Sequence, residues 1–409
     1  MKYKDTPFGK IPDSWELASI SEVTELVTDY VANGSFASLA KNVTYKDEED
    51  VAVLIRLVDY NNDFKGDFVF IDEHAYEFLG KSKLYGGEII ISNVGANVGT
   101  VFRCPQLQYK MSLAPNAIMV KFKENDDFYY FWLRSHAGQH MLHSIVTGSA
   151  QPKFNKTNFR DMLVPVPPRN QQDKIVSILQ PLEDKIEHNN RINKNLLEQA
   201  QSIFTQEFLM LDRIPDGWQE SSLLGIADYL NGLAMQKYRP KDDEQGLPVL
   251  KIKELRQGSC DFNSELCSPS IKPEYIVHDG DVIFSWSGSL LVDLWCGGTC
   301  GLNQHLFKVT SSTYDKWFYY AWTNHHLQKF AAIAADMATT MGHIKREELS
   351  KAEVLIPSQS DYDRIGGLLA PLYDLVIANR IENRKLASLR DELLPQLMSG
   401  QLDVSEVSL

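Results

Sequence analysis

The stretch that decides the fold is IVSILQPLEDKIEHNNRINKNL, residues 175–196, because it returns as IGGLLAPLYDLVIANRIENRKL at residues 365–386. Eight positions are identical in the two stretches, and no gap interrupts them. They are Ile175, Leu179, Pro181, Leu182, Asp184, Asn189, Asn193 and Leu196 in the first copy, and Ile365, Leu369, Pro371, Leu372, Asp374, Asn379, Asn383 and Leu386 in the second. One chain therefore carries two copies of one unit, which suggests two related contacts to one long partner.

Each copy has the pattern of a long helix with a coiled-coil seam. Apolar or small residues recur in alternating steps of four and three, at Ile175, Leu179, Leu182, Ile186, Asn189, Asn193, Leu196, Ala200 and Ile203. A single asparagine on such a seam can simply face solvent. Two matched pairs (Asn189 and Asn193, Asn379 and Asn383) instead favour side chains that meet across a helix pair and fix its register. We expect the two helices to pack on each other, with Pro181 and Pro371 kinking or restarting them.

The repeat extends to the segments before the helices. IPDSWE at 11–16 returns as IPDGWQ at 214–219, and VPVP at 164–167 returns as VLIP at 354–357. Glycine-punctuated runs of β-branched and aromatic residues predict strands, at residues 51–58, 68–71, 88–92, 117–122, 247–252 and 281–285. Amphipathic patterns predict helices that start at Phe128 and Trp317.

The fold class predicted from these patterns is α+β, with two globular domains joined by two long antiparallel spacer helices in a pseudo-twofold internal repeat. The expected boundaries are 1–169 for the first domain, 170–209 for the central helix, 210–360 for the second domain, 361–400 for the C-terminal helix and 401–409 for a tail. A helix from Gln172 to Phe208 would span roughly 55 Å, or about 16 base pairs of DNA. Such a chain would read two different half-sites across a spacer that it does not read.

Bulk properties narrow the class of protein. The length of 409 residues allows two domains, and 44% hydrophobic and 23% charged residues are ordinary for a globular protein. No apolar run reaches the ~18–20 residues of a membrane span and no signal sequence opens the chain, so we expect a cytoplasmic protein. The net charge of −13 argues mildly against a nucleic-acid partner, although the local distribution of charge matters more than the sum. The five cysteines lack paired zinc-ligand spacing, which favours free thiols over a zinc site.

Several motifs, taken in order, give the chain a resemblance to the specificity subunits of type I restriction-modification systems. They are IPDSW at 11–15 and its repeat, Pro167-Pro168 before Gln171-Gln172, GDVIFSWSG at 280–288, LNQHL at 302–306, TMGHI at 340–344 and LLPQLMSG at 393–400. The chain departs from the family pattern where Gln171-Gln172 replaces a glutamate-glutamine pair and where Tyr362 takes the place of the second glutamine.

The resemblance implies two target-recognition domains, each reading one half of a bipartite site in double-stranded DNA. It also implies spacer helices that dock two adenine-N6 methyltransferase subunits, with restriction subunits joining the full complex. S-adenosylmethionine, ATP and magnesium would belong to those partners. The specificity subunit itself would hold no cofactor, no metal and no catalytic residue.

Candidate DNA contacts are polar side chains on loops and strand ends, because base edges and phosphates are read by such groups. Ordinary loop polarity is the competing interpretation of each one. In the first domain the candidates are Ser92, Asn93, Asn97, Ser149, Gln151, Lys153, Asn155 and Lys156. In the second domain they are Lys237, Arg239, Ser285, Trp286, Ser287, Thr339, Thr340, His343, Lys345 and Arg346.

Two other functions remain open, a stand-alone DNA-modifying enzyme and a non-catalytic coiled-coil scaffold. An adenine methyltransferase needs an Asn/Asp-Pro-Pro motif, and the chain has neither Asp-Pro-Pro nor Asn-Pro-Pro. His305 has no carboxylate partner at a catalytic spacing, so a hydrogen-bonded structural role is favoured. Trp15 and Trp218 at equivalent positions fit core packing better than a docking role.

Overall fold

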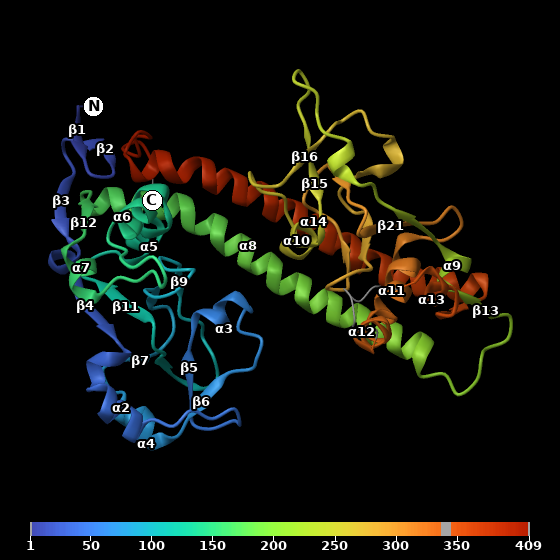
Figure 1. Ribbon diagram of the computed structural model, residues 1–409, viewed down its shortest axis with the longest axis horizontal. Helices are drawn as coiled ribbons and strands as arrows, with labels where there is room; N and C mark the ends of the chain where they lie inside the picture. Colours follow the sequence, from blue (N-terminus) through green and yellow to red (C-terminus); the bar gives the residue numbers. More distant parts are fainter. Residues whose placement is uncertain (1, 337–344, 408–409) are drawn as a thin grey trace. The chain divides into compact units, whose positions relative to one another are not determined.

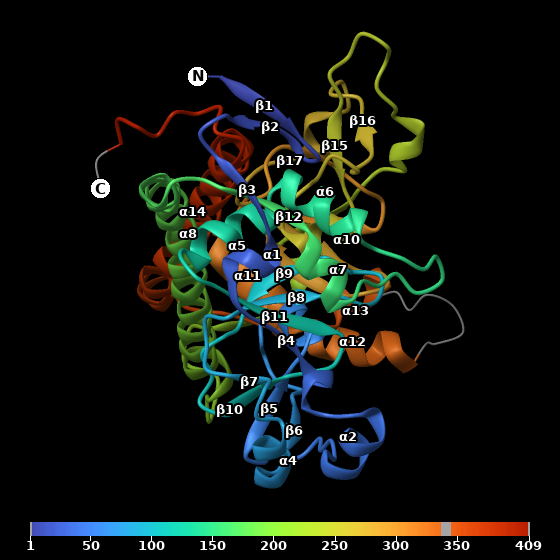
Figure 2. The same cartoon turned by 90° about the vertical axis from the view of Figure 1, so that its left-hand side faces the viewer.

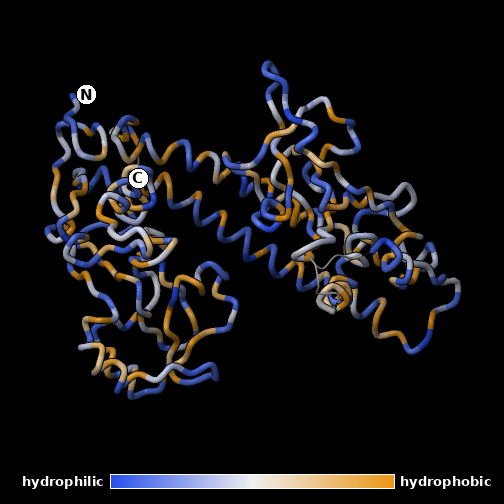
Figure 3. The backbone as a smooth tube through the Cα atoms, viewed as in Figure 1, coloured by the Kyte–Doolittle hydropathy of each residue, from blue (hydrophilic) through white to orange (hydrophobic). Residues whose placement is uncertain are grey.

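The computed structural model describes residues 2–336 and 345–407 (Figure 1). The chain divides into two compact units, unit 1 with Met1–Leu182 and Leu389–Leu409, and unit 2 with Glu183–Ser388. Two long helices, α8 (Arg169–Phe204) and α14 (Gln359–Met398), begin in one unit and end in the other. Figure 3 shows hydrophobic residues interspersed with hydrophilic ones along both helices, as in helices that bury one face.

Unit 1 is built on two four-stranded sheets. The first has the order β4-β11-β8-β9 and is antiparallel throughout. Its strands are β4 (Thr24–Asp29), β8 (Ile89–Ser92), β9 (Val101–Arg103) and β11 (Ala117–Phe122). The second has the order β6-β5-β10-β7, with β5 and β10 parallel. Its strands are β5 (Ala52–Ile55), β6 (Val69–Ile71), β7 (Lys83–Leu84) and β10 (Lys110–Leu113).

Unit 2 repeats both sheets in the same order. The antiparallel sheet is β14-β21-β18-β19, formed by β14 (Asp228–Asn231), β18 (Val282–Ser285), β19 (Leu291–Leu294) and β21 (Leu306–Thr310). The second sheet is β16-β15-β20-β17, formed by β15 (Leu247–Leu250), β16 (Leu266–Cys267), β17 (Ile276–Val277) and β20 (Cys300–Leu302). As β5 pairs with β10, so β15 pairs in parallel with β20. The sequence repeat is therefore a repeat of topology.

In each unit, a strand near the start of the globular part pairs with the last strand of that part. In unit 1, β3 (Glu16–Ser19) pairs with β12 (Leu163–Val166), and a hairpin of β1 (Tyr3–Thr6) and β2 (Gly9–Pro12) precedes them. In unit 2, β13 (Gln219–Ser222) pairs with β22 (Glu353–Ile356). The indole of Trp15 donates to Gln171 Oε1 over 2.7 Å, and that of Trp218 donates to Asp361 Oδ2 over 3.0 Å. These bonds tie the start of each domain to the start of the long helix that follows it.

Short helices cover the sheets. In unit 1 they are α1 (Ile20–Val23), α2 (Phe36–Asn42), α3 (Leu57–Asn61), α4 (Glu73–Phe78), α5 (Asp126–Arg134), α6 (His136–Ser144) and α7 (Lys156–Asp161). In unit 2 they are α9 (Leu223–Ile226), α10 (Ile252–Gln257), α11 (Lys316–His325), α12 (Leu327–Asp336) and α13 (Arg346–Ser350). The expected helices at Phe128 and Trp317 are confirmed as α5 and α11. Both bury a row of aromatic side chains in the core of their unit.

Asparagine side chains connect α8 to α14 within unit 2. Asn189 Nδ2 donates to Asn383 Oδ1 over 2.8 Å, and Asn379 Nδ2 donates to Asn193 Oδ1 over 2.9 Å. Residue numbers rise along one helix as they fall along the other, so the helices are antiparallel there. Asn189 and Asn193 are buried, and Ala200 and Phe204 continue the buried face of α8 into the core of unit 2. In unit 1, Ile175 and Leu179 of α8 share a core with Leu397 and Met398 of α14.

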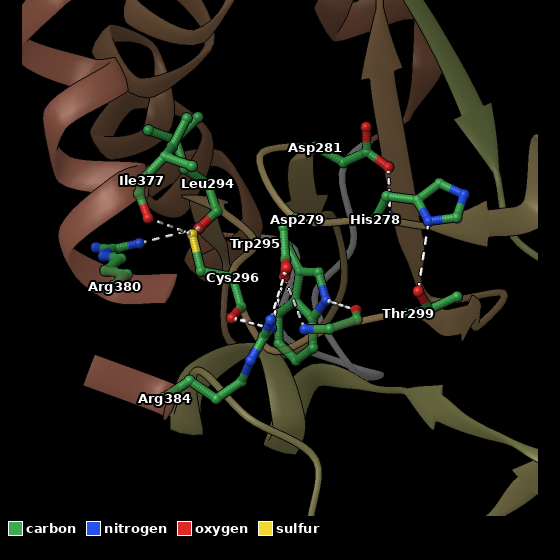
Figure 4. A network of polar contacts seen from close by, with 11 residues as sticks. His278, Asp279, Asp281, Leu294, Trp295, Cys296, Thr299, Ile377, Arg380 and Arg384 are labelled. Carbon is green, nitrogen blue, oxygen red and sulfur yellow. Dashed lines mark hydrogen bonds and ion pairs between the residues drawn. The ribbon is translucent and has the colours of Figure 1, made fainter. Parts of the chain in front are cut away.

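Two arginines fasten α14 to the globular part of unit 2 (Figure 4). Arg384 donates from both Nη atoms to Asp279, at 2.6 and 2.7 Å, and from Nη1 to the Cys296 carbonyl oxygen. One turn earlier, Arg380 Nη1 donates to Asp293 Oδ1 over 2.7 Å. The Arg384 guanidinium lowers the pKa of the Asp279 carboxyl below its ordinary value. The helix and the domain are therefore held together by charge-assisted bonds as well as by apolar packing.

Three expectations about local structure need correction, namely the lengths of two strands and a restart of the long helices at proline. The strand expected at 51–58 ends at Ile55, and the strand expected at 247–252 ends at Leu250. Helices α3 and α10 follow at once, because Asp59 and Glu254 accept hydrogen bonds from the backbone N–H groups of Arg56 and Lys251 and so cap new helices. Pro181 and Pro371 restart neither helix. Both prolines are exposed, so the carbonyls that lose a helical donor can bond to water.

Candidate nucleic-acid interface

Strand register identifies equivalent positions in the two units. Ser92 pairs with Ala117 at the end of β8 and β11, and Ser285 pairs with Leu306 at the end of β18 and β21. Asp29 of β4 pairs with Ile118, and Asn231 of β14 pairs with Phe307. At this end of the sheet, unit 1 therefore presents Asp29, Asn93 and Asn116 where unit 2 presents Asn231, Trp286 and His305.

In unit 1 two of the predicted clusters come together. Asn93 Nδ2 donates to the Phe154 carbonyl over 3.0 Å, and the backbone N–H of Phe154 donates to the Asn93 carbonyl over 3.1 Å. Nearby, the N–H of Gly95 donates to the Pro152 carbonyl. The loop after β8 and the loop before α7 thus form one surface, although about sixty residues separate them in the sequence.

The predicted residues of this surface differ in exposure. Asn97, Ser149, Gln151, Lys153 and Asn155 are exposed, whereas Ser92 is buried under the sheet end. The Asn155 side chain accepts from the N–H of Asn158 and caps α7. The five exposed side chains can reach a ligand, while Ser92 contributes to the strand end itself.

Lys156 is held back from the surface by an ion pair. Its Nζ lies 2.8 Å from Asp29 Oδ1, with both side chains largely buried. Helix α7 therefore lies against the edge strand β4, as the labels in Figure 2 let the reader follow. Much of the Lys156 charge is neutralised within the unit, so Lys153 is the stronger candidate for a phosphate contact.

A pocket of about 600 Å³ opens beside this surface. Its lining comprises Asp29, Tyr30, Val31, Phe36, Leu39, Ala40, Val43, Tyr45, Asn93, Val94, Pro115, Asn116 and Ala117. Phe36 is 80% exposed and Tyr45 is 52% exposed, both unusually high for aromatic side chains. The side-chain oxygen of Asn93 is buried and accepts no hydrogen bond from any described residue. Leaving such an acceptor unpaired costs about 1–3 kcal/mol.

In unit 2 the equivalent place is filled by the protein itself. Trp286 Nε1 donates to Asn231 Oδ1 over 3.2 Å, and its ring lies 5.6 Å from that of Phe307. Ser287 Oγ lies 3.3 Å from His305 Nδ1. Ser285 and Ser287 are buried, so the exposed His305 and the half-buried Trp286 are the groups that this strand end offers to a ligand.

The remaining described candidates of unit 2 come from two segments, one before β15 and one at the start of α13. Lys237 is exposed, and Arg239 pairs with Glu265 at 3.0 Å beside β16. Arg346 Nη1 donates to the Tyr229 carbonyl over 3.5 Å, and its neighbour Lys345 is exposed at the start of α13. Thr339, Thr340 and His343 lie outside the described residues.

Register reveals four residues that the sequence patterns did not single out as contacts. The sequence patterns assign no role to Asp29, Asn116 or Asn231, and they favour a structural role for His305. Asn116 adopts φ = 69°, a left-handed conformation in which asparagine is enriched among non-glycine residues. Aligning the two halves of the repeat strand by strand would have found all four.

The described residues hold no group of three or more histidine, cysteine, aspartate or glutamate side chains arranged to bind a metal ion. All five cysteines are free thiols. Burial raises the pKa of Cys296 to about 11 and raises that of Cys104 further. Among the described helices, none combines the length and hydropathy that a bilayer span requires.

Comparison with known proteins assigns the family. The model of the type I restriction modification DNA specificity domain matches residues 12–198 and again residues 215–389. The chain is similar to the MjaIX specificity subunit of Methanocaldococcus jannaschii, with 23% identity over 99% of this chain and 98% of the relative. It is also similar to the EcoKI specificity subunit of Escherichia coli, with 23% identity over 73% of this chain and 66% of the relative.

A solved structure shares the fold. The type I restriction-modification S subunit from M. genitalium aligns with a TM-score of 0.56 and 12% identity, over 96% of this chain and 98% of that one. Specificity subunits of this kind are the non-catalytic components of their systems. With two matches that together cover most of its length, the chain belongs to the type I restriction-modification specificity subunit family.

Proposed function

We propose that the chain reads a bipartite site in double-stranded DNA, one half-site per unit. The carrying observation is that both units present the same strand end, with different side chains on it. Unit 1 offers Asn93 and Asn116 there, and unit 2 offers Trp286 and His305. One backbone frame with two sets of readout groups supports recognition of two different half-sites.

In this proposal exposed side chains on loops and at the start of α13 supply the base and phosphate contacts. Lys153, Gln151 and Asn155 do so in unit 1, and Lys345 and Arg346 do so in unit 2. The net charge of −13 is compatible with this role, because the acidic residues can lie on faces that do not meet DNA. The division into residues 1–169, 170–209, 210–360, 361–400 and 401–409 is retained as a proposal for the functional domains.

We infer that the partners are two adenine-N6 methyltransferase subunits, with restriction subunits in the complete complex. The paired helices α8 and α14 support this role, because the sequence repeat offers each methyltransferase an equivalent docking face. S-adenosylmethionine, ATP and magnesium are then bound by the partners and not by this chain.

Methyl-transfer assays test the proposal. The purified chain alone should transfer no methyl group to DNA. Combined with its cognate methyltransferase subunit, it should direct N6-methylation of adenine in one bipartite sequence. Methyl transfer by the chain alone, or methylation by the pair without sequence preference, would overturn the proposal.

A further inference from the structure

We propose that the pocket of unit 1 holds a single nucleobase turned out of the bound DNA duplex. The inference rests on the proposed DNA-reading function and deepens it, because it gives one unit a site that the other lacks. The ligand of the pocket is then a planar heterocyclic base that remains attached to the DNA backbone.

The location of the pocket favours DNA as the source of its ligand. Asp29, Asn93 and Asn116 belong both to its lining and to the strand end where the candidate contacts gather. The loop that carries Lys153 is hydrogen bonded to Asn93 through Phe154. A duplex lying on these loops would therefore pass the mouth of the pocket.

The lining has the chemistry of a base site. Tyr30, Phe36 and Tyr45 provide aromatic faces, and every nucleobase can stack on such a face. Asn116 is exposed and carries the kind of amide group that pairs with adenine at its N6 and N7 atoms.

The size of the pocket is adequate. Small-molecule sites in proteins measure about 300–1,000 Å³, and this pocket measures about 600 Å³. A pocket of this size admits a base together with part of its sugar. Both enter when a nucleotide rotates about the DNA backbone and leaves the duplex.

Unit 2 supplies an internal comparison. Its Trp286 stands at the position equivalent to Asn93, and the indole packs beside Phe307 and donates to Asn231. The bicyclic side chain occupies the side of the strand end that Asn93 leaves open in unit 1. The pocket wall of unit 1 also includes α2, whereas the segment between β14 and β15 in unit 2 carries only a short 3-10 helix, Met235–Lys237. The base site is therefore specific to unit 1.

The test measures affinity of the full chain with its methyltransferase partner for its bipartite duplex. A mismatch is placed at each position of the half-site read by unit 1 and of its flanks. Turning out a mismatched base costs less than turning out a paired one, so binding should tighten about tenfold at one position. Removing the base at that position should weaken binding by a similar factor.

Variants identify the pocket as the cause. The double variant Phe36→Ala and Tyr45→Ala removes two exposed rings, and Asn93→Trp copies unit 2 and fills the space. Both should abolish the mismatch effect at that position. Tyr85→Ala is the matched control, because Tyr85 is a 75% exposed aromatic residue of the same unit that does not line the pocket.

The outcomes separate the two claims. A base turned out into the methyltransferase subunit would give a mismatch effect that survives in both pocket variants. If every mismatch effect survives in them, the base site does not exist, although the DNA-reading function stands. If the wild-type complex binds no bipartite duplex, the proposed function itself fails.

Discussion

Residues 93 and 286 occupy one register position in two copies of the same sheet, and they differ completely in chemistry. Asn93 is a small amide whose oxygen is unpaired among the described residues, and Trp286 is a large indole bonded to Asn231. The backbone needs neither residue type in particular, because the adjacent buried serines, Ser92 and Ser285, end both strands in the same way. Side-chain identity at this position is therefore free to serve recognition.

Lys153→Ala tests the phosphate contacts of unit 1. The affinity of the complex for its cognate duplex should fall several-fold and almost equally for all sequences. The slope of log K against log salt concentration should become shallower by about one unit, because one fewer counterion is released. Binding titrations across a salt series measure both. Lys110→Ala, which removes a lysine paired with Glu73 in the same unit, should leave the slope unchanged, and an unchanged slope in Lys153→Ala would refute the contact.

At the scale of elements, the asparagine pairs should fix the register of α8 against α14 rather than add to the stability of the helix pair. Asn193→Leu leaves the Asn379 amide without its acceptor and should lower the free energy of unfolding by about 1–3 kcal/mol. The double variant Asn193→Leu and Asn379→Leu should recover most of that loss, because two apolar side chains fit a seam. Denaturant unfolding measures both, with Asn195→Leu on an exposed position of α8 as control. A double variant less stable than the single one would contradict this account.

The arginine contacts of α14 should make the stability of unit 2 depend on pH. Arg384 lowers the pKa of Asp279, so the pair stabilises the fold fully above the ordinary aspartate value of about 4. That stability is lost as the pH falls through the lowered pKa of the folded state. Arg384→Ala should cost about 1–2 kcal/mol at neutral pH after allowance for partial exposure, and should flatten the loss below pH ~4. Unfolding curves between neutral and acidic pH test this, with Arg256→Ala at an exposed position as the control. If stability falls as steeply with acid in Arg384→Ala as in the wild type, the Arg384–Asp279 pair is not the cause of that fall.

The long helices were predictable because their information is local. An apolar residue at every third or fourth position can be recognised within one stretch of sequence, and the second copy of the stretch repeats the same pattern. Helices α3 and α10 were missed because strong β-formers continue past Ile55 and Leu250. The capping carboxylates of Asp59 and Glu254 outweigh that preference.

The interface was only partly predictable, since it depends on contacts between distant segments. The loop residues around Lys153 were proposed as contacts from their polarity alone, and they remain a prediction. Asp29 and Asn116 were not, because only the pairing of β4, β11 and β8 brings them beside Asn93. Order among strands is set by burial across the whole domain, which no short window of sequence contains.

At the scale of the whole molecule, the proposed function implies that the helix pair acts as a ruler, because its length sets the length of the DNA spacer that is not read. An insertion near Ile203 to Phe208 would disturb the core of unit 2, where Phe204 and Phe208 are buried. One heptad added to α8 after Leu182 and one added to α14 before Leu389 would keep the seam in phase. The recognised spacer should lengthen by about three base pairs, from 1.5 Å per residue and 3.4 Å per base pair. Sequencing of methylated sites measures it, and an unchanged spacer would refute the ruler.

The central claim is that two units of one chain read two halves of one site. Methylome sequencing of cells that express the chain with its methyltransferase partner tests it most directly, for the wild type and for His305→Ala. In the wild type, N6-methyladenine should occur in a single bipartite motif. In the variant, discrimination against wrong bases in one half-site should fall by about 1–3 kcal/mol, while the other half-site is still read as in the wild type. A continuous motif in the wild type, or loss of discrimination in both halves of the variant, would contradict the claim.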